Sequence, residues 1–206
     1  ELSRETLGDR HPQTLVSLTN RADLLMALGR RLEAEPLYEE ALRFRREVLG
    51  ERHPSTLMSQ SKYGRVIHLL GDALAAEPIL EEASRLLTET LGLRHPESLI
   101  SLSNYAGVLR PLGRTSLAGP YLSQLVGLNR EVFGEDHPIT LESLQEFGNV
   151  LAQVGRSDAA ERQFAEALRL RRQVLGNGHP DTLASANNYA RMLGERGDHV
   201  ASERLF

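Results

Sequence analysis

The dipeptide His-Pro occurs five times in this chain, and each copy lies 42 residues after the previous one. A strict period of this length is typical of a repeat array, in which each repeat packs only on its neighbours. No insertion or deletion interrupts the period, so the sequence divides into blocks that begin at a histidine. The complete blocks are 11–52, 53–94, 95–136 and 137–178, followed by a partial block at 179–206, and residues 1–10 match the end of a preceding block.

Each block is predicted to form two antiparallel helices. In the first block Pro12 suits the first turn of a helix, because its missing N–H would have no partner there. The apolar residues that follow recur at spacings of three and four, as on one face of a helix: Leu15, Leu18, Ala22 and Leu25. Gly29 and Gly50 end the two runs, which predicts helices over about 12–28 and 32–49. For the whole chain we expect nine complete helices, partial second helices at both ends and no strand.

Small residues recur at fixed positions and would let helix axes approach closely. In the first helices they are Ala22, Gly64, Ala106, Gly148 and Ala190, and in the second helices Ala34, Ala76, Ala118 and Ala160. With the pattern HPxTL, N, GR, AEPL, AL and VLG, the whole chain resembles tetratricopeptide repeats in the 42-residue form of the kinesin light chain. The resemblance implies a right-handed superhelical solenoid of antiparallel helix pairs, in which the first helices line a concave groove. The Asn-Asn pair typical of kinesin light chains is complete only at Asn187-Asn188, so their cargo preference does not carry over.

The third block departs from the pattern. Pro111 falls two residues before the glycine that ends the first helix, and it is expected to end or bend that helix early. Gly119 and Gly127 weaken the second helix by about 1 kcal/mol each relative to Ala. We expect the array to flex or change pitch in this block.

Composition excludes several classes of protein. The chain has no Cys, which excludes disulfides and thiolate metal sites and fits a cytoplasmic location. No apolar run is long enough to span a bilayer. The formal net charge of −4 gives no general attraction to nucleic acid or anionic lipid.

The repeated histidines are predicted to have a structural role. Copies one repeat apart should lie about 10 Å from each other, whereas the ligands of a metal lie about 2 Å from one ion. His68 and His199 lie off the pattern, and neither has a nucleophile and carboxylate nearby in sequence. No Gly-rich phosphate loop occurs. We therefore expect no enzyme activity, no metal and no cofactor.

Two arginine clusters raise the question of nucleic-acid binding. Their members are Arg43, Arg45 and Arg46, and Arg169, Arg171 and Arg172. Both clusters lie on second helices, which form the outer layer, and glutamates are interleaved with them, as in the i,i+4 pair Glu39–Arg43. A solvated outer face explains them better than a nucleic-acid surface.

The predicted binding residues lie on one face of the first helices. At these positions the residue type varies from block to block, whereas the apolar and small residues of the repeat recur. Val16, Met58 and Ile100 would form an exposed apolar strip, and Lys62 and Arg65 a basic centre with Asp23 as the nearest counter-charge. Asparagine can bond a peptide backbone with both donor and acceptor groups. The candidate ligand-binding residues are Val16, Asn20, Asp23, Met58, Lys62, Arg65, Ile100, Asn104, Asn149, Asn188 and Arg191.

These features predict a protein-protein interaction module that binds a peptide or a partner surface in the concave groove. The ligand would carry an acidic group beside an apolar anchor. One alternative is the sensor or autoinhibitory arm of a larger signalling protein, such as a nucleotide-switch ATPase or a protease. Another is a scaffold that mainly associates with itself.

The residues near the two ends of the chain also carry an expectation. Leu2 and Leu7 at one end, and Leu205 and Phe206 at the other, fall on apolar seam positions. Terminal repeats normally carry a polar outer face. We therefore expect the array to be part of a longer one, and a chain with the neighbouring helices to melt at a higher temperature.

Overall fold

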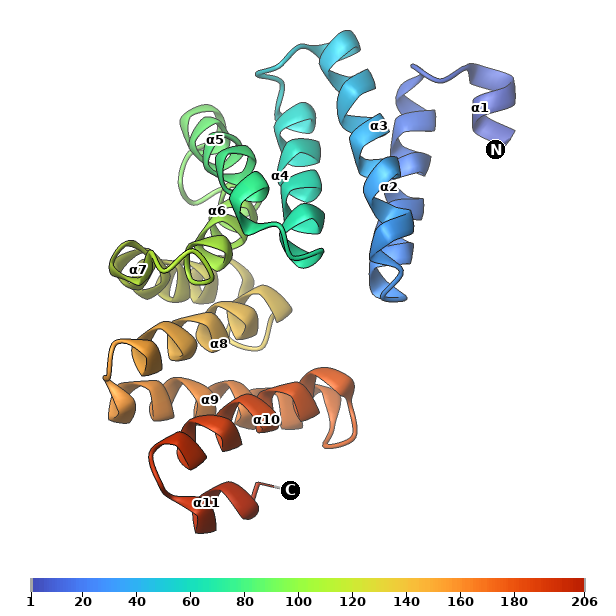
Figure 1. The fold of residues 1–206 in the computed structure, drawn as a ribbon. Helices are drawn as coiled ribbons and strands as arrows, with labels where there is room; N and C mark the ends of the chain where they lie inside the picture. The colour runs from blue at the N-terminus through green and yellow to red at the C-terminus, as the bar shows by residue number, and fades with distance from the viewer. Residues whose placement is uncertain (1, 206) are drawn as a thin grey trace. The chain divides into compact units, whose positions relative to one another are not determined.

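The computed structural model describes residues 2–205, with side chains from residue 4 onward, and its regular structure over that range is helical (Figure 1). The first helices of the blocks are α2 (Pro12–Ala27), α4 (Pro54–Leu69), α6 (Pro96–Leu109), α8 (Pro138–Gln153) and α10 (Pro180–Glu195). The second helices are α3 (Arg31–Leu49), α5 (Ala73–Leu91), α7 (Thr115–Phe133) and α9 (Ser157–Leu175). The short helices α1 (Leu2–Leu7) and α11 (His199–Glu203) are partial second helices. Over the described residues the predicted all-α fold, with nine complete helices, is confirmed.

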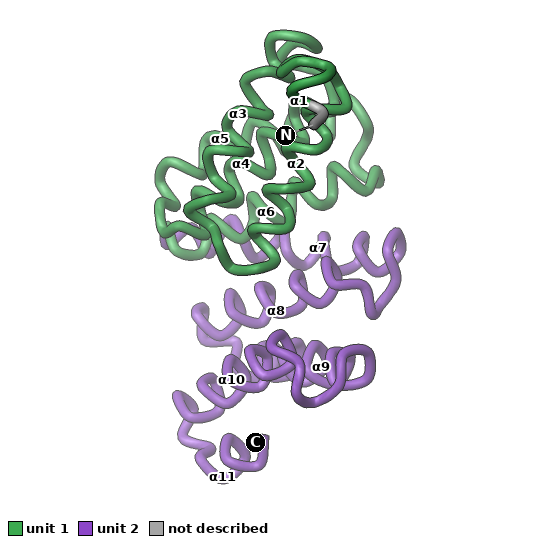
Figure 2. Tube along the Cα trace, turned by 90° about the vertical axis from the view of Figure 1, so that its right-hand side faces the viewer, with its two compact units in different colours: residues 1–112 green, residues 113–206 purple. Residues whose placement is uncertain are grey.

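The chain divides into two compact units, and the boundary between them falls inside the third block (Figure 2). The first unit extends to Leu112 and contains α1 to α6, each packed on the next, with α4 also in contact with α6. The second unit begins at Gly113 and contains α7 to α11, again each packed on the next. Each unit is therefore a stack of antiparallel helix pairs, as the repeats predict.

The small residues allow the close helix packing that the repeats predict. Ala34 in the second helix of the first block is 0% exposed, as are its counterparts in the next three blocks. A Cβ atom added to Gly64 would lie 2.8 Å from the side chain of Leu80, and one added to Gly148 would lie 2.9 Å from Phe164. Both distances are shorter than normal carbon contacts, so a larger residue would push the two helices of a pair apart.

The five repeated histidines are helix N-caps. Each precedes a proline at the first helical position, has extended backbone angles, and accepts a hydrogen bond on Nδ1 from the backbone N–H two residues later. In the second block this bond joins His53 Nδ1 and the Ser55 N–H at 3.1 Å. The cap satisfies one of the four N–H groups that have no partner inside the helix. The sequence predicts a structural role for these histidines, and in the structure each one caps the N-terminus of the first helix of its block.

Pro111 shortens the first helix of the third block as predicted. The helix α6 has 14 residues, whereas the other four first helices have 16 residues each. It ends at Leu109, because Pro111 has no backbone N–H to donate to the carbonyl four residues before it, although Arg110 keeps helical backbone angles.

Candidate binding face

We use the name first-helix face for the predicted binding residues on the first helices, taken separately in each unit. In the first unit it consists of positions on α2, α4 and α6, and in the second unit of positions on α8 and α10. Val16 is 48% exposed, whereas Met58 and Ile100 are only partly exposed. Met58 packs against the buried cluster of Leu57, Leu86 and Leu87. The predicted apolar strip is therefore exposed mainly at Val16.

An ion pair joins the first two blocks on this face. The Lys62 ammonium lies 2.6 Å from Oδ2 and 2.9 Å from Oδ1 of Asp23. The Tyr38 hydroxyl, from the second helix of the first block, donates to Asp23 Oδ1 at 2.6 Å. Burial raises the pKa of Tyr38 above its ordinary value, and the Asp23 carboxylate raises it further. The counter-charge expected for the basic centre is thus in contact with Lys62, and three helices meet at Asp23.

Arg45 reaches this region from the second helix, which the sequence reasoning did not foresee. Its guanidinium donates to the Thr19 hydroxyl on α2 at 2.9 Å, to the Ser59 hydroxyl on α4, and to the Leu15 carbonyl oxygen at 3.3 Å. Burial lowers the pKa of Arg45, and the Asp23 carboxylate opposes that shift. The expectation that this arginine cluster is solvated is therefore wrong for its middle member.

The same correction applies in the second unit. Arg171 on α9 donates to the Gln145 side-chain oxygen on α8 at 3.3 Å and to the Ser185 hydroxyl on α10, and burial lowers its pKa. The direction of Arg45 and Arg171 could have been inferred from the residue at the equivalent position of another block. The counterpart of Arg45 in the second block is Leu87, which is fully buried, so this position faces the gap between two first helices.

The predicted asparagines differ in their surroundings. Asn20 is exposed on α2, whereas Asn104 on α6 is partly buried and donates to the Ser61 hydroxyl at 3.1 Å. In the second unit Asn149 donates to Glu146 at 3.2 Å, and Asn188 is partly buried.

The two predicted arginines on this face lie in different units. Arg191 forms an exposed i,i+4 pair with Glu195 at 2.9 Å. Arg65 is exposed on α4 in the first unit, where Lys62 also lies. The structure thus gathers Asp23, Lys62 and Arg65 in one unit and keeps Asn149, Asn188 and Arg191 as a separate set in the other.

His68, one of the two histidines off the repeat pattern, is half-buried near the end of α4. Burial lowers its pKa, and the positive charges of Arg110 and Arg65 lower it further. His68 is therefore neutral over a wider pH range than an exposed histidine.

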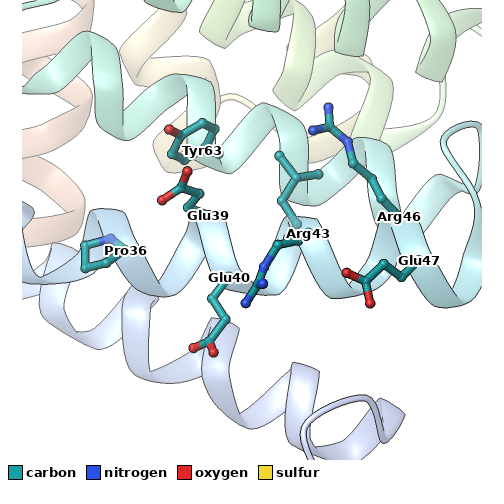
Figure 3. Close-up of a pocket in the computed structure, with 8 residues that line it drawn as sticks. Pro36, Glu39, Glu40, Arg43, Arg46, Glu47 and Tyr63 are labelled. Atoms are coloured by element: carbon teal, nitrogen blue, oxygen red, sulfur yellow. The ribbon is translucent and has the colours of Figure 1, made fainter.

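A hollow of about 740 Å³ lies on the outer side of α3, away from the predicted binding residues (Figure 3). It is lined by Pro36, Glu39, Glu40, Leu42, Arg43, Arg46, Glu47 and Tyr63. Most of its charged residues are paired: Glu40 with Arg4, Glu47 with Arg10, and Arg46 with Glu51.

The described residues contain no group of three His, Asp or Glu side chains placed to hold a metal ion. None of the described helices combines the length and the apolarity needed to cross a bilayer.

Comparison with known proteins identifies the repeats. The model of a family described as "Tetratricopeptide repeat" matches residues 13–89, 97–173 and 147–206. None of the curated proteins compared with the chain matches it.

Three solved structures illustrate the similarity. A Podosopora anserina protein with nearly identical TPR-like repeats, assigned to the kinesin light chains, is 26% identical over 95% of this chain and 92% of that one, with a TM-score of 0.74. BtubC (BKLC) from P. vanneervenii is 20% identical over 99% of this chain and 81% of that one, with a TM-score of 0.74. The Rap protein complexed with Competence and Sporulation Factor is 13% identical over 91% of this chain and 50% of that one, with a TM-score of 0.78.

Proposed function

Because the chain belongs to the tetratricopeptide repeat family, whose domains bind proteins or peptides, we propose that its first-helix face binds an extended peptide of a partner protein. The Rap protein, which shares the fold, is complexed with Competence and Sporulation Factor. That complex supports the use of this fold to hold a ligand. The chemistry of the ligand follows from the residues of the first unit.

The observation that carries the proposal is the balance of charge around Asp23. Lys62, Arg65 and the inward Arg45 supply three positive charges near this carboxylate, which Lys62 and the Tyr38 hydroxyl share. Lys62 and Asp23 are both well exposed, and an exposed ion pair contributes only about 0–1 kcal/mol. A carboxylate on a ligand can therefore replace Asp23 as the partner of Lys62 at small cost.

The apolar part of the ligand is expected to lie against Val16. Val16, Asn20 and Asp23 are spaced by four and three residues on α2, so they share one face of that helix. Asn20, between the other two, presents a donor and an acceptor to a peptide backbone. The ligand that fits is an extended segment with an acidic group next to an apolar side chain.

The test compares two double substitutions that remove the same charge. The first, Lys62→Gln with Arg65→Gln, acts on the first-helix face. The control, Arg52→Gln with Arg85→Gln, removes two exposed arginines that both pair with Glu89. A peptide selected with the wild-type protein from an immobilised peptide library is titrated calorimetrically into all three proteins.

We expect the selected peptides to contain an acidic residue beside an apolar one. The first variant should bind roughly tenfold more weakly, a loss of about 1.4 kcal/mol, and the difference should shrink at high salt. The control should bind like the wild type. Equal affinities for all three proteins would place the binding surface away from Lys62 and Arg65.

A further inference from the structure

The hollow on the outer side of α3 brings an aromatic ring and a carboxylate together. Tyr63 comes from α4 and is partly buried, whereas Glu39 comes from α3, and Figure 3 shows the two side chains facing each other with Pro36 nearby. Burial raises the pKa of Tyr63, and the negative charges of Glu39 and Glu35 raise it further. Both carboxylates therefore lie close enough to act on the phenol.

Within the described residues, neither Glu39 nor Glu35 takes part in an ion pair. Arg43 follows Glu39 by four residues, and an i,i+4 pair between them was expected. Its guanidinium instead lies over the Phe44 ring, 4.6 Å from the ring centre. Figure 3 shows it turned toward Glu40 and away from Tyr63. Within the part of the chain that the structure describes, the two carboxylates next to Tyr63 are thus not paired with a cation.

The second unit contains a related tyrosine and glutamate with a cation bound, although Ala165 stands there in the place of Glu39. Tyr189 and Glu161 stand three repeat periods after Tyr63 and Glu35. The Tyr189 hydroxyl donates to Glu161 Oε1 at 3.1 Å, and the Arg196 guanidinium donates to Glu161 Oε2 at 2.8 Å. The chain therefore places a guanidinium on this pair of residues where a suitable arginine is available.

The first unit cannot fill the site in this way. The counterpart of Arg196 is Leu70, the residue that follows the end of α4, and it is 37% exposed. Leucine offers no charge to Glu35. The first unit thus keeps the tyrosine and the glutamate and replaces the cation by an apolar residue.

We propose that the hollow on the outer side of α3 binds a cationic side chain, arginine or lysine, of a partner protein. The Glu39 carboxylate, which lines the hollow, and the Glu35 carboxylate, one helical turn before it on α3, supply charge-assisted hydrogen bonds, which are stronger than neutral ones. The Tyr63 ring supplies a surface on which a guanidinium can stack. This site lies outside the first-helix face, so its test is independent of the function proposed above.

The probe for the test is N-acetyl-arginine methylamide, and the control probe is its citrulline analogue, which has the same shape and no charge. Each is titrated into the isotopically labelled protein while the ring signals of Tyr63 are followed by NMR. These signals are assigned with Tyr63→Phe. We expect the arginine probe to shift them along a saturable curve and the citrulline probe to leave them unchanged. The double variant Glu35→Gln with Glu39→Gln should weaken binding roughly fivefold or more.

Exchanging the residues that differ between the units gives matched variants. Leu70→Arg should fill the first-unit site from within and abolish the response of Tyr63. Arg196→Leu should open the counterpart site, so that the arginine probe shifts the ring signals of Tyr189, which it leaves unchanged in the wild type. Circular dichroism checks that each variant is folded. The proposal is overturned if Tyr63 does not respond in the wild type, if citrulline acts like arginine, or if the double glutamine variant binds equally well.

Discussion

Removing one histidine cap should destabilise the helix that it begins. His53 is the most suitable of the five, because its side chain is exposed and its replacement by alanine removes little packing. By contrast, His137 stacks on Phe133 with ring centres 4.8 Å apart, so its substitution would also remove an aromatic contact. In His53→Ala the Ser55 N–H loses the acceptor that lies 3.1 Å away. This N–H then has no side-chain partner in the first turn of α4.

The magnitude follows from measured N-caps. Replacement of a capping side chain by alanine costs about 0.5–2 kcal/mol, typically about 1 kcal/mol. The hydrogen bond between Ser55 and His53 is exposed, so water can replace part of it and the cost should stay below the upper end of this range. We therefore expect a loss of about 1 kcal/mol in the free energy of unfolding, or about 2–4 °C in melting temperature for a chain of this size.

The assay is urea unfolding followed by circular dichroism, with His53→Asn as the matched control. Asparagine is a preferred N-cap and can accept the same hydrogen bond on its side-chain oxygen. The asparagine variant should recover most of the lost free energy. If alanine and asparagine destabilise the protein equally, the histidine contributes through contacts of its ring and the capping argument fails.

Three further predictions concern single side chains. Arg45→Met keeps the apolar stem and removes the guanidinium from two first helices, so it should cost about 1–3 kcal/mol in urea unfolding; an unchanged midpoint would contradict the role given to these bonds. His68 has a lowered pKa in the folded state, so the unfolded chain binds the proton more readily, and stability should fall as the pH drops below the ordinary value of about 6.5. His68→Met should reduce that fall, which melting curves at several pH values can measure. Gly148→Ala should destabilise α8 because its Cβ would meet Phe164, whereas Gly127→Ala, which meets no atom within 4 Å, should stabilise α7 by about 1 kcal/mol; the opposite order would refute the packing argument.

The helix pairs could be predicted because each block repeats the same local signals. Pro12 and Gly29 mark the beginning and end of the first helix through their own backbone preferences. These preferences depend on one residue and its immediate neighbours, so they can be interpreted without tertiary structure. The early end of α6 at Leu109 was predictable for the same reason, because Pro111 acts on the backbone directly before it.

The candidate site was predictable only in part. The pairing of Lys62 with Asp23 followed from two facing first helices with opposite charges one block apart. The inward direction of Arg45 did not, because arginine on an outer helix usually lies in solvent and only the burial of Leu87 at the equivalent position argues otherwise. The outer hollow was also missed, because it depends on how Tyr63 of one helix meets Glu39 of another.

The reach of Arg45 also bears on how the array deforms. Each repeat of a solenoid contacts only its neighbours, so the contacts between successive repeats act in series and the weakest of them yields most. At the seam between α2 and α4, one guanidinium holds hydroxyls on both helices, so widening this seam breaks charged hydrogen bonds. At the next seam, between α4 and α6, the side chain of Leu87 takes the same place and offers only apolar contact, and the hydrogen bond from Asn104 to Ser61 joins neutral groups. We expect the contact between α2 and α4 to resist opening more strongly than the contact between α4 and α6. Amide exchange in α4 and α6 would measure this difference.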